Sequence, residues 1–376
     1  GDLIIYHYDQ PLMALLSLSN VQRAFLIMGV FLNDFAKDPL SSAQLNSLVH
    51  SRGGIYFPHS NLQSIFSENT LPRKISAVCE RSTHVVRELQ RELGIPCEDI
   101  KNSDLLSAQS LSIEGEGSDS FPFLPADFLG LQNLQNLTIT HMKAQVRTPL
   151  VDDLKDLLNL QSLTLTHHWI EETPKNFMEG PYRLRHLDLS WNNIFEFKRN
   201  AFRQIFPSQI QSGSVTLNLS HNTAEFLPRR RVYVHPGAFD NCLSVTDLFM
   251  KDMNLTELKA SVFDPLVNLQ ILDLSQNRLR RIENILTSPA LKALKKLDLS
   301  ENPFEYINAD EFSELSSLQS LRLEKNNLPE FPEFLLTLPQ LKELIFCGRK
   351  FTLEKYQSIL ELAQRVNPSL SLQICD

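Results

Sequence analysis

The sequence predicts an α/β fold, a solenoid of about ten coils whose short parallel strands stack into one curved sheet, preceded by a helical domain. Near-identical phrases recur along the chain, and within each phrase the leucines alternate with polar residues. No such repeat is visible before about residue 105. The expected parts are therefore an N-terminal helical domain or cap over 1–104, repeats over 105–350, and a closing helix and strand over 351–376.

The repeat unit is represented by Leu187-Asp-Leu-Ser-Trp-Asn192, which returns with few changes at 272–277, 297–302 and 321–326. A further leucine stands three residues before each copy, so the shared pattern is L-x-x-L-x-L-x-x-N. This pattern is identified as the signature of the leucine-rich-repeat family. Later aromatics such as Phe202 resemble its typical subclass, which implies strands on a concave side and short turns or helices on the convex side.

One position of the repeat organises the turn that follows each strand. Its asparagine is expected to satisfy backbone groups there, where an unpaired buried amide would be costly. Four coils lack the asparagine, so we expect their turns to be less regular. Aligned on this position, the coils carry Met142, His168, Asn192, Asn222, Met253, Asn277, Asn302, Asn326 and Arg349.

The first hundred residues carry helical rather than repeat patterns. Apolar residues at helical spacing predict helices near 21–35, 41–53 and 72–93, the last ending at Gly94. Arg23 interrupts the longest apolar stretch, so we expect a buried helix there and no membrane span. We expect these helices to cover the N-terminal end of the repeat core, because solenoid ends need covering.

A second interpretation of this region rests on residues 57–82, which resemble an F-box. That motif spaces a Leu-Pro start, an Ile-Phe pair and a later Val-Cys in much this way, although Phe57 replaces its usual leucine and no tryptophan follows. The resemblance implies a substrate adaptor of a ubiquitin ligase, with a ligase scaffold as its partner. The residues that carry it are Pro58, Leu62, Ile65, Phe66 and Val78.

Composition narrows the classes of function. Of the 376 residues, 42% are hydrophobic and 21% are charged, which is ordinary for a folded soluble protein. The net charge of −8 disfavours a nucleic-acid partner, because such binding needs many cations. No phosphate-binding glycine loop, nucleophile motif or paired-cysteine metal motif is present. We therefore expect a monomeric protein-interaction scaffold that binds a protein partner, without enzymatic activity, cofactor or metal.

The cysteines favour a reducing compartment. Their number is odd, they are scattered, and no cluster flanks either end of the repeats. We expect a cytoplasmic protein, and disulfide-free repeats behind a helical domain resemble effector proteins that bacteria deliver into host cells. An extracellular receptor ectodomain is the alternative. The five residues are Cys79, Cys97, Cys242, Cys347 and Cys375.

Three glycosylation sequons bear on the same question. They begin at Asn136, Asn218 and Asn254, and each has the form Asn-Leu-Ser or Asn-Leu-Thr. The first two overlap predicted strands, so we interpret all three as chance matches. Gly1 is not a natural start residue, and we expect the natural N-terminus and any signal to lie upstream.

The candidate binding residues come from the register of the coils. The position before the asparagine places His141, His167, Trp191 and His221 side by side, and Phe249 occupies an outward sheet position that is usually polar. Aromatic residues on a surface often carry interface energy. Histidines in a line do not converge tetrahedrally, so we predict no metal site. They do predict binding that is sensitive to pH between about 5 and 7.

The insertion 228–236 is a second candidate. It places Arg229, Arg230 and Arg231 beside Tyr233, a cationic patch suited to carboxylates or phosphates. Loops inserted into repeats tend to lie beside the binding face, so we expect this patch next to the aromatic row.

Overall fold

The computed structural model describes residues 3–5, 55–57, 78–115, 127–141, 154, 157–168, 170–171, 184–202, 213–223, 231–283, 285–347 and 352–375. The chain divides into the units Gly1–Ile75 and Ser76–Asp376. In the first unit the description covers β1 (Leu3–Ile5) and β2 (Ile55–Phe57), an antiparallel pair. The helices predicted near 21–35 and 41–53 lie outside the described residues, as do Pro58, Leu62, Ile65 and Phe66 of the F-box prediction.

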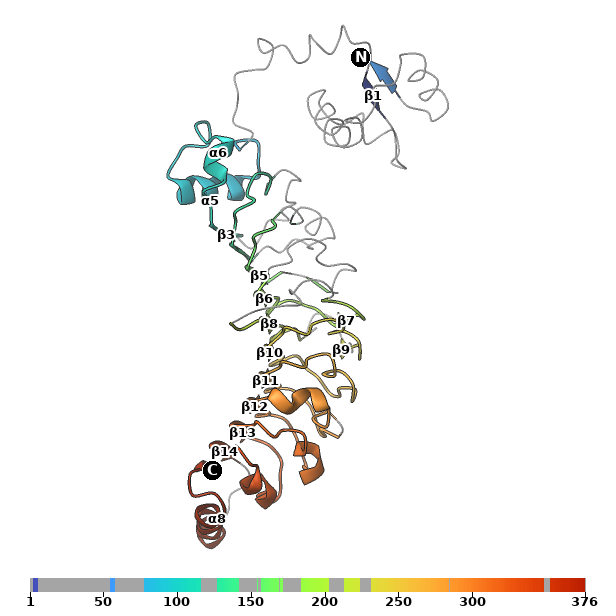
Figure 1. Cartoon of the computed structure of the whole chain (residues 1–376), viewed down its shortest axis with the longest axis vertical. Helices are drawn as coiled ribbons and strands as arrows, with labels where there is room; N and C mark the ends of the chain where they lie inside the picture. The colour runs from blue at the N-terminus through green and yellow to red at the C-terminus, as the bar shows by residue number, and fades with distance from the viewer. Residues whose placement is uncertain are drawn as a thin grey trace. The chain divides into compact units, whose positions relative to one another are not determined.

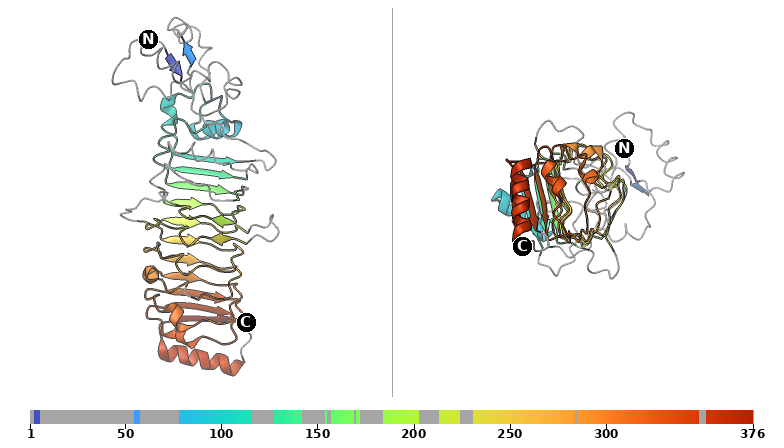
Figure 2. Two further views of the ribbon diagram at one scale, coloured as in Figure 1. Left: turned by 90° about the vertical axis from the view of Figure 1, so that its right-hand side faces the viewer. Right: turned by 90° about the horizontal axis from the view of Figure 1, so that it is seen from below.

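The second unit is the predicted solenoid. Eleven parallel strands are hydrogen-bonded in one sheet, called here the long sheet (Figure 1). Figure 2 shows its strands stacked one above another. They are β3 (Ser110–Glu114), β4 (Asn136–Thr140), β5 (Ser162–Thr166), β6 (His186–Asp188), β8 (Thr216–Asn218), β10 (Asp247–Phe249), β11 (Ile271–Asp273), β12 (Lys296–Asp298), β13 (Ser320–Glu324), β14 (Glu343–Cys347) and β15 (Ser371–Cys375).

The register between strands is the one that the repeat pattern predicts. Leu187 lies opposite Leu217, and Leu217 opposite Leu248, and all three side chains are buried. The outward row pairs Asp188 with Asn218 and Asn218 with Phe249. Because side chains alternate across a strand, this register puts every leucine into one continuous core and every intervening side chain on the outer face.

Short elements close the coils on the side away from the long sheet. They are β7 (Glu196–Phe197) and β9 (Tyr233–Val234), which form a small parallel sheet, and the 3-10 helices η1 (Pro289–Ala293), η2 (Ala309–Phe312) and η3 (Glu333–Thr337). Beneath them lies the predicted aromatic series, fully buried at Phe202, Phe239 and Phe263 and nearly so at Phe312. These rings fill the half of the core that the leucines do not reach.

The asparagine column does what the sequence analysis expects of it. Asn222 is fully buried, and its Nδ2 donates to the carbonyls of Leu189 and Leu219 at 3.0 and 2.7 Å. Its Oδ1 accepts the N–H of Ile194 at 3.0 Å. His168 substitutes for asparagine in its own coil, because its Nε2 lies 3.0 Å from the carbonyl oxygen of Ile139. One buried amide thus ties two coils together.

The residue before the asparagine position is left-handed in eight successive coils, and we call this series the turn row. Its members are His141, His167, Trp191, His221, Asp252, Gln276, Glu301 and Lys325, with φ between 50° and 60°. The expectation of less regular turns where the asparagine is missing was wrong for the described coils. In the coil that carries Met253, for example, a backbone bond to the next coil, Asp252 N–H to Ser275 O at 3.0 Å, holds the turn without an asparagine.

Helices lie at both ends of the repeats. At the N-terminal end, α5 (Thr83–Leu93) packs against β3, and α6 (Asn102–Leu105) follows. Gly94 ends α5 with φ 67°, as predicted, but the helix starts at Thr83 rather than near Pro72. Figure 2 shows α8 (Leu353–Val366) across the other end. No helix among the described residues is long and apolar enough to cross a membrane.

A buried charged contact joins the residues just before α5 to the segment between β3 and β4. The Arg81 guanidinium donates to the carbonyl of Asp127 at 2.9 Å, and the Asp127 carboxylate accepts the N–H of Ser82 at 2.7 Å. Arg81 is 7% exposed and Asp127 is fully buried. Burial lowers the pKa of Arg81, and the nearby Asp127 charge acts in the opposite direction. The contact fixes the chain before α5 onto the solenoid.

Candidate functional site

The four aromatic residues predicted to lie side by side form a continuous stack, called here the aromatic ladder. His141 stacks on His167 with ring centroids 4.3 Å apart. His167 stacks on Trp191 at 5.4 Å, and Trp191 on His221 at 3.9 Å, with interplanar angles of 6° and 15°. The common left-handed turn aims the side chains in the same direction, one per coil. Ring faces are therefore covered by other rings, and ring edges are presented to solvent.

Carboxylates stand at both ends of the aromatic ladder. His141 Nδ1 lies 3.8 Å from the carboxylate of Glu114, which is on β3. His221 Nδ1 lies 3.0 Å from the carboxylate of Asp252, the next member of the turn row. Asp252 is thus within hydrogen-bond distance of a ring nitrogen of His221, whereas Glu114 lies near His141 at a distance too long for a hydrogen bond. The six side chains make one connected surface across coils one to six.

The ladder is exposed unevenly. Trp191 is 52% exposed, whereas the side chain of His221 is 20% exposed. Burial lowers the pKa of His167, and the neighbouring His141 lowers it further, although Asp188 acts in the opposite direction. Two adjacent imidazoles repel one another when both are charged. The centre of the ladder is consequently biased toward the uncharged state.

The aspartates of the Leu-Asp-Leu-Ser phrase have a structural role. Asp188, Asp273 and Asp298 each accept the backbone N–H of the serine two residues later, at 2.8 to 2.9 Å. Each of the three strands ends after three residues, at the aspartate itself. The carboxylate therefore bonds the backbone N–H of the serine just beyond the end of its strand. Burial raises the pKa of Asp298.

Phe249 lies in the outward row of the long sheet, between Asn218 and Asp273, as the register predicts. Its side chain is half-buried. It stands three residues before Asp252, the carboxylate that ends the aromatic ladder. It therefore adds an apolar contact to the sheet face beside the ladder.

The arginine insertion lies elsewhere. Arg229 and Arg230 fall outside the described residues, whereas Arg231 and Tyr233 are exposed at β9. Figure 1 places β9 on the far side of the coils from β6 and β8. For Arg231 and Tyr233, the expectation that the patch adjoins the aromatic row was wrong. Val232 and Val234 are buried in the core on that side, so the alternating Arg231 and Tyr233 point away from it.

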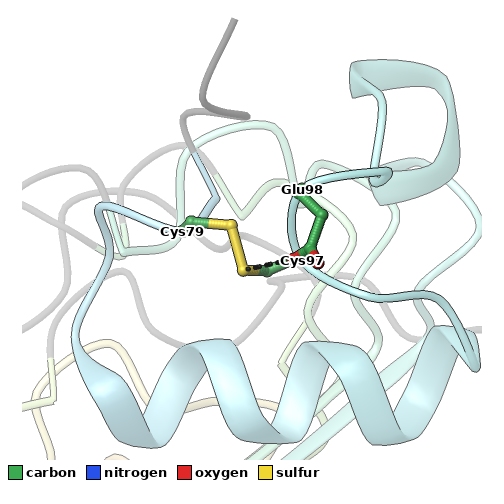
Figure 3. A group of neighbouring side chains, drawn as sticks. All are labelled: Cys79, Cys97 and Glu98. Carbon is green, nitrogen blue, oxygen red and sulfur yellow. Dashed lines mark hydrogen bonds between the residues drawn. A yellow bond between two sulfur atoms is a disulfide. The ribbon is translucent and has the colours of Figure 1, made fainter.

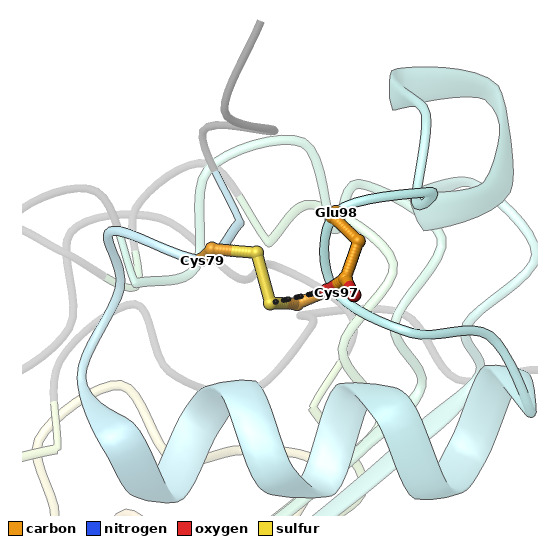
Figure 4. Close-up of a disulfide and its surroundings, with 3 residues drawn as sticks. All are labelled: Cys79, Cys97 and Glu98. Carbon is orange, nitrogen blue, oxygen red and sulfur yellow. Dashed lines mark hydrogen bonds between the residues drawn. A yellow bond between two sulfur atoms is a disulfide. The ribbon is translucent and has the colours of Figure 1, made fainter.

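The cysteines correct the expectation of free thiols. Cys79 and Cys97 form a disulfide beside α5 (Figures 3 and 4). Cys347 on β14 is also disulfide-bonded, and the register sets Cys375 of β15 opposite it. Bonded cysteines therefore lie at both ends of the repeats, so the expectation of a disulfide-free protein was wrong and the cysteines no longer support a cytoplasmic location. The sequence did not show the pairs, because a helix lies between the two cysteines at each end: α5 between Cys79 and Cys97, and α8 between Cys347 and Cys375.

The remaining cysteine has a different environment. Cys242 is the free one among the described residues, and it is buried in the core. Burial raises the pKa of its thiol to about 12, so it is unreactive at neutral pH. Cys79, Cys97 and Glu98 place potential ligand atoms within 4.8 Å of one another, but the two sulfurs are bonded and offer no thiolate (Figure 3).

Sequence reasoning found the members of the aromatic ladder but missed the carboxylates at its ends. Asp252 was already in the aligned row, and its signal was its place next to His221. Glu114 ends β3 and pairs in register with Thr140, the residue before His141. Register alone locates both residues. Whether their side chains turn toward the histidines depends on rotamers that a sequence does not encode.

Comparison with known proteins agrees with this architecture. Family models described as "Leucine rich repeat" and "Leucine Rich Repeat" match residues 287–328 and 183–210. Toll-like receptor 7 of Drosophila melanogaster is 30% identical over 157 residues, 39% of this chain and 10% of the relative. Tsukushi-A of Xenopus laevis is 34% identical over 122 residues, 30% of this chain and 35% of the relative.

Human Toll-like receptor 9 is 31% identical over 147 residues, 38% of this chain and 14% of the relative. A solved structure of a TLR13–ssRNA13 complex superposes with a TM-score of 0.52 and 20% identity, covering 68% of this chain and 38% of the other. At that identity the likeness concerns the fold alone. This chain spans between a tenth and about a third of the length of the three relatives.

Proposed function

The chain belongs to the leucine-rich-repeat proteins, and on that premise we propose that it is an extracellular binding module without enzymatic activity. Its partner is a protein, held against the aromatic ladder. The location follows from the bonded cysteines, because structural disulfides persist in oxidising environments and are rare in the cytosol. Several relatives carry the word receptor in their names, which supports a role in recognition.

The observation that carries the proposal is the backbone of Trp191. Its φ is 57°, a conformation that glycine, asparagine, aspartate and histidine tolerate best. A non-glycine residue there costs roughly 1–2 kcal/mol. Stacking on two histidines returns about 0.5–1.5 kcal/mol per pair, which offsets that cost, yet half of the indole remains in solvent. The exposed half of the indole adds nothing to folding, whereas contact with a partner would use it.

The charge pattern favours a protein over a nucleic acid. Glu114 and Asp252 close the ladder at its two ends, and Asp188 lies beside its centre. Carboxylates at these positions repel phosphates, and the ring faces on which bases would stack are already covered. The same carboxylates attract lysine or arginine side chains. A protein segment that combines basic and apolar residues fits this surface.

The adaptor and effector interpretations gain less support. Val78 of the F-box-like segment is buried beside the Cys79–Cys97 disulfide, and a ligase adaptor works in the reducing cytosol. A bacterial effector acting in host cytoplasm meets the same objection. Both interpretations predict free thiols in the native protein. Thiol labelling of the natively purified chain, with and without denaturant, separates them from the extracellular module.

The decisive experiment compares two substitutions in the turn row. Trp191→Asn keeps a residue suited to the left-handed turn and removes the indole, and Gln276→Asn makes the same change three coils away. Purified proteins are screened against an array of extracellular proteins, and hits are measured by surface plasmon resonance. We expect Trp191→Asn to weaken a hit at least about tenfold, as for an interface hot spot, and Gln276→Asn to leave it unchanged.

Two results would overturn the proposal. The first is equal binding by wild type and Trp191→Asn at equal unfolding free energy. The second is saturable binding of a single-stranded RNA oligonucleotide that Trp191→Asn abolishes, which would replace the protein partner by a nucleic acid. Arg231→Glu with Tyr233→Ala tests the β9 patch separately. Loss of binding in that variant alone would move the contact surface to β9.

A further inference from the structure

The three sequons differ in their surroundings. Each has its central leucine fully buried, at Leu137, Leu219 and Leu255. Asn136 and Asn218 lie on the outer face of their strands, and Asn254 and Thr256 are partly exposed, whereas Ser220 is 6% exposed. What separates the three sites is the space and the bonding around the asparagine side chain.

Asn136 is open to modification. It is the first residue of β4 and is exposed, and its Nδ2 donates only to the hydroxyl of Ser110, at 3.0 Å. The site lies five residues before His141, about 16 Å of extended strand away from the aromatic ladder. A bulky group on Asn136 would extend from the margin of the long sheet where the strands begin, opposite the margin that carries the aromatic ladder.

Asn254 is also open. It lies two residues beyond Asp252, in a left-handed turn with φ 58°, and is partly exposed. Its side chain makes no hydrogen bond to any described residue. Its neighbours Met253 and Leu255 are fully buried, so the asparagine is the part of this segment that faces outward.

Asn218 is closed. Its Nδ2 donates to the carboxylate of Asp188 at 3.1 Å, and its Oδ1 accepts the N–H of Ser220 at 3.1 Å. Asp188 and Phe249 flank it in the adjacent strands. A sugar at this position would displace those side chains and cover the sheet face beside Trp191.

In place of the interpretation of all three sequons as chance matches, we propose that Asn136 and Asn254 carry N-linked glycans and that Asn218 does not. The bonded cysteines imply passage through an oxidising secretory route, where sequons of this form are modified. In the transfer, Nδ2 forms a bond to the anomeric carbon of an oligosaccharide. The bond from that carbon to a polyprenyl pyrophosphate breaks, and the amide gives up one proton. No electrons are exchanged with an external oxidant.

The two glycans flank the aromatic ladder without covering it. One lies at the strand-start margin of the long sheet in the second coil, and the other lies past the turn row in the sixth. The surface between them holds His141, His167, Trp191 and His221. This pattern narrows the directions from which a partner approaches, and it does not depend on what the partner is.

The test is site mapping on the full chain, secreted from animal cells behind a leader peptide. Peptide-N-glycosidase in heavy-oxygen water converts each glycosylated asparagine to labelled aspartate, which mass spectrometry then locates. We expect label at Asn136 and Asn254 and none at Asn218. Label at Asn218, or its absence from either of the other two in the secreted protein, overturns the proposal.

Matched variants supply an independent readout. Thr256→Ala removes the Asn254 sequon without touching the asparagine, and Thr256→Ser preserves it. We expect loss of one glycan's mass on a denaturing gel for the alanine variant and no change for the serine variant. Equal mobility of both variants and wild type contradicts occupancy of Asn254. Neither readout requires a ligand, so failure here is distinguishable from failure of the binding role.

Discussion

The indole of Trp191 lies on the imidazole of His221 with ring centroids 3.9 Å apart, and the two planes differ by 15°. His221 is in turn held by Asp252, 3.0 Å from its Nδ1. The tryptophan is therefore pre-set in one orientation before any partner arrives. Ordering of a long side chain on binding commonly costs about 0.5–1.5 kcal/mol, and here most of that cost falls on folding instead.

The buried asparagine column predicts a large effect at Asn222. Asn222→Ala removes the donor to the carbonyl of Leu219 and the acceptor of the Ile194 N–H inside the core, and it leaves the Leu189 carbonyl with Asn192 Nδ2 as its donor. We expect a loss of about 2–4 kcal/mol in the free energy of unfolding, measured by urea denaturation. His168→Asn is the matched control, because either side chain reaches the carbonyl of the preceding coil. Equal stability of the Asn222→Ala variant and wild type would contradict this role.

The Cys79–Cys97 bond predicts a local effect. It closes a loop with a sequence separation of 18, and its removal costs about 3 kcal/mol on a chain-entropy estimate. Each repeat contacts only its neighbours, so the loss of stability is expected at the end that carries this bond. In the Cys79→Ser, Cys97→Ala variant, hydrogen exchange should accelerate in α5 and β3 and stay unchanged in β11 and β12. Uniform acceleration along the solenoid would refute the local view.

The contact between Arg81 and Asp127 predicts a loss of stability when the Asp127 charge is removed. Asp127→Asn keeps an oxygen for the N–H of Ser82 but leaves the buried guanidinium without a nearby negative charge. We expect the free energy of unfolding to fall by about 3 kcal/mol. Glu80→Gln removes an exposed charge in the same segment and should change stability by less than about 0.5 kcal/mol. Similar effects of the two substitutions would argue against the contact.

The His167 environment predicts a dependence on pH. Its pKa is lowered in the fold, chiefly by burial, so the unfolded chain takes up a proton at a higher pH than the native protein does. Its contribution to stability is complete above the unfolded pKa near 6.5 and is lost as pH falls through the folded value. Urea unfolding at pH 7.5 and 5.0 should show a smaller loss for His167→Asn than for wild type. An equal loss in both proteins would count against this.

The repeat architecture was predictable because it is periodic. Leu187, Leu217 and Leu248 occupy one column of a register that a sequence pattern alone defines, and the structure confirms it. The aromatic ladder followed from the same alignment, because one residue per coil occupies each position of the turn. The Asp252 contact needed a rotamer, and the sequence did not supply one.

The cysteines and the arginine insertion were misread for different reasons. The cysteines were judged by their distance along the chain, whereas the solenoid brings together residues that are one coil apart. Cys347 and Cys375 are separated by a helix and lie opposite each other in register. Arg231 was placed beside the aromatic row because inserted loops tend to lie beside the binding face, yet the buried Val232 and Val234 hold its strand on the far side of the core.

In the turn row, the backbone geometry of the turn does not depend on which side chain the turn presents to solvent. Backbone bonds between coils set the left-handed turn for histidine, tryptophan, aspartate, glutamine, glutamate and lysine alike. The chemistry of the row is therefore free to change over generations while the architecture stays constant. The same property makes the row a place for grafting, in which Asp252, Gln276 and Glu301 are rewritten to extend the ring stack toward β13.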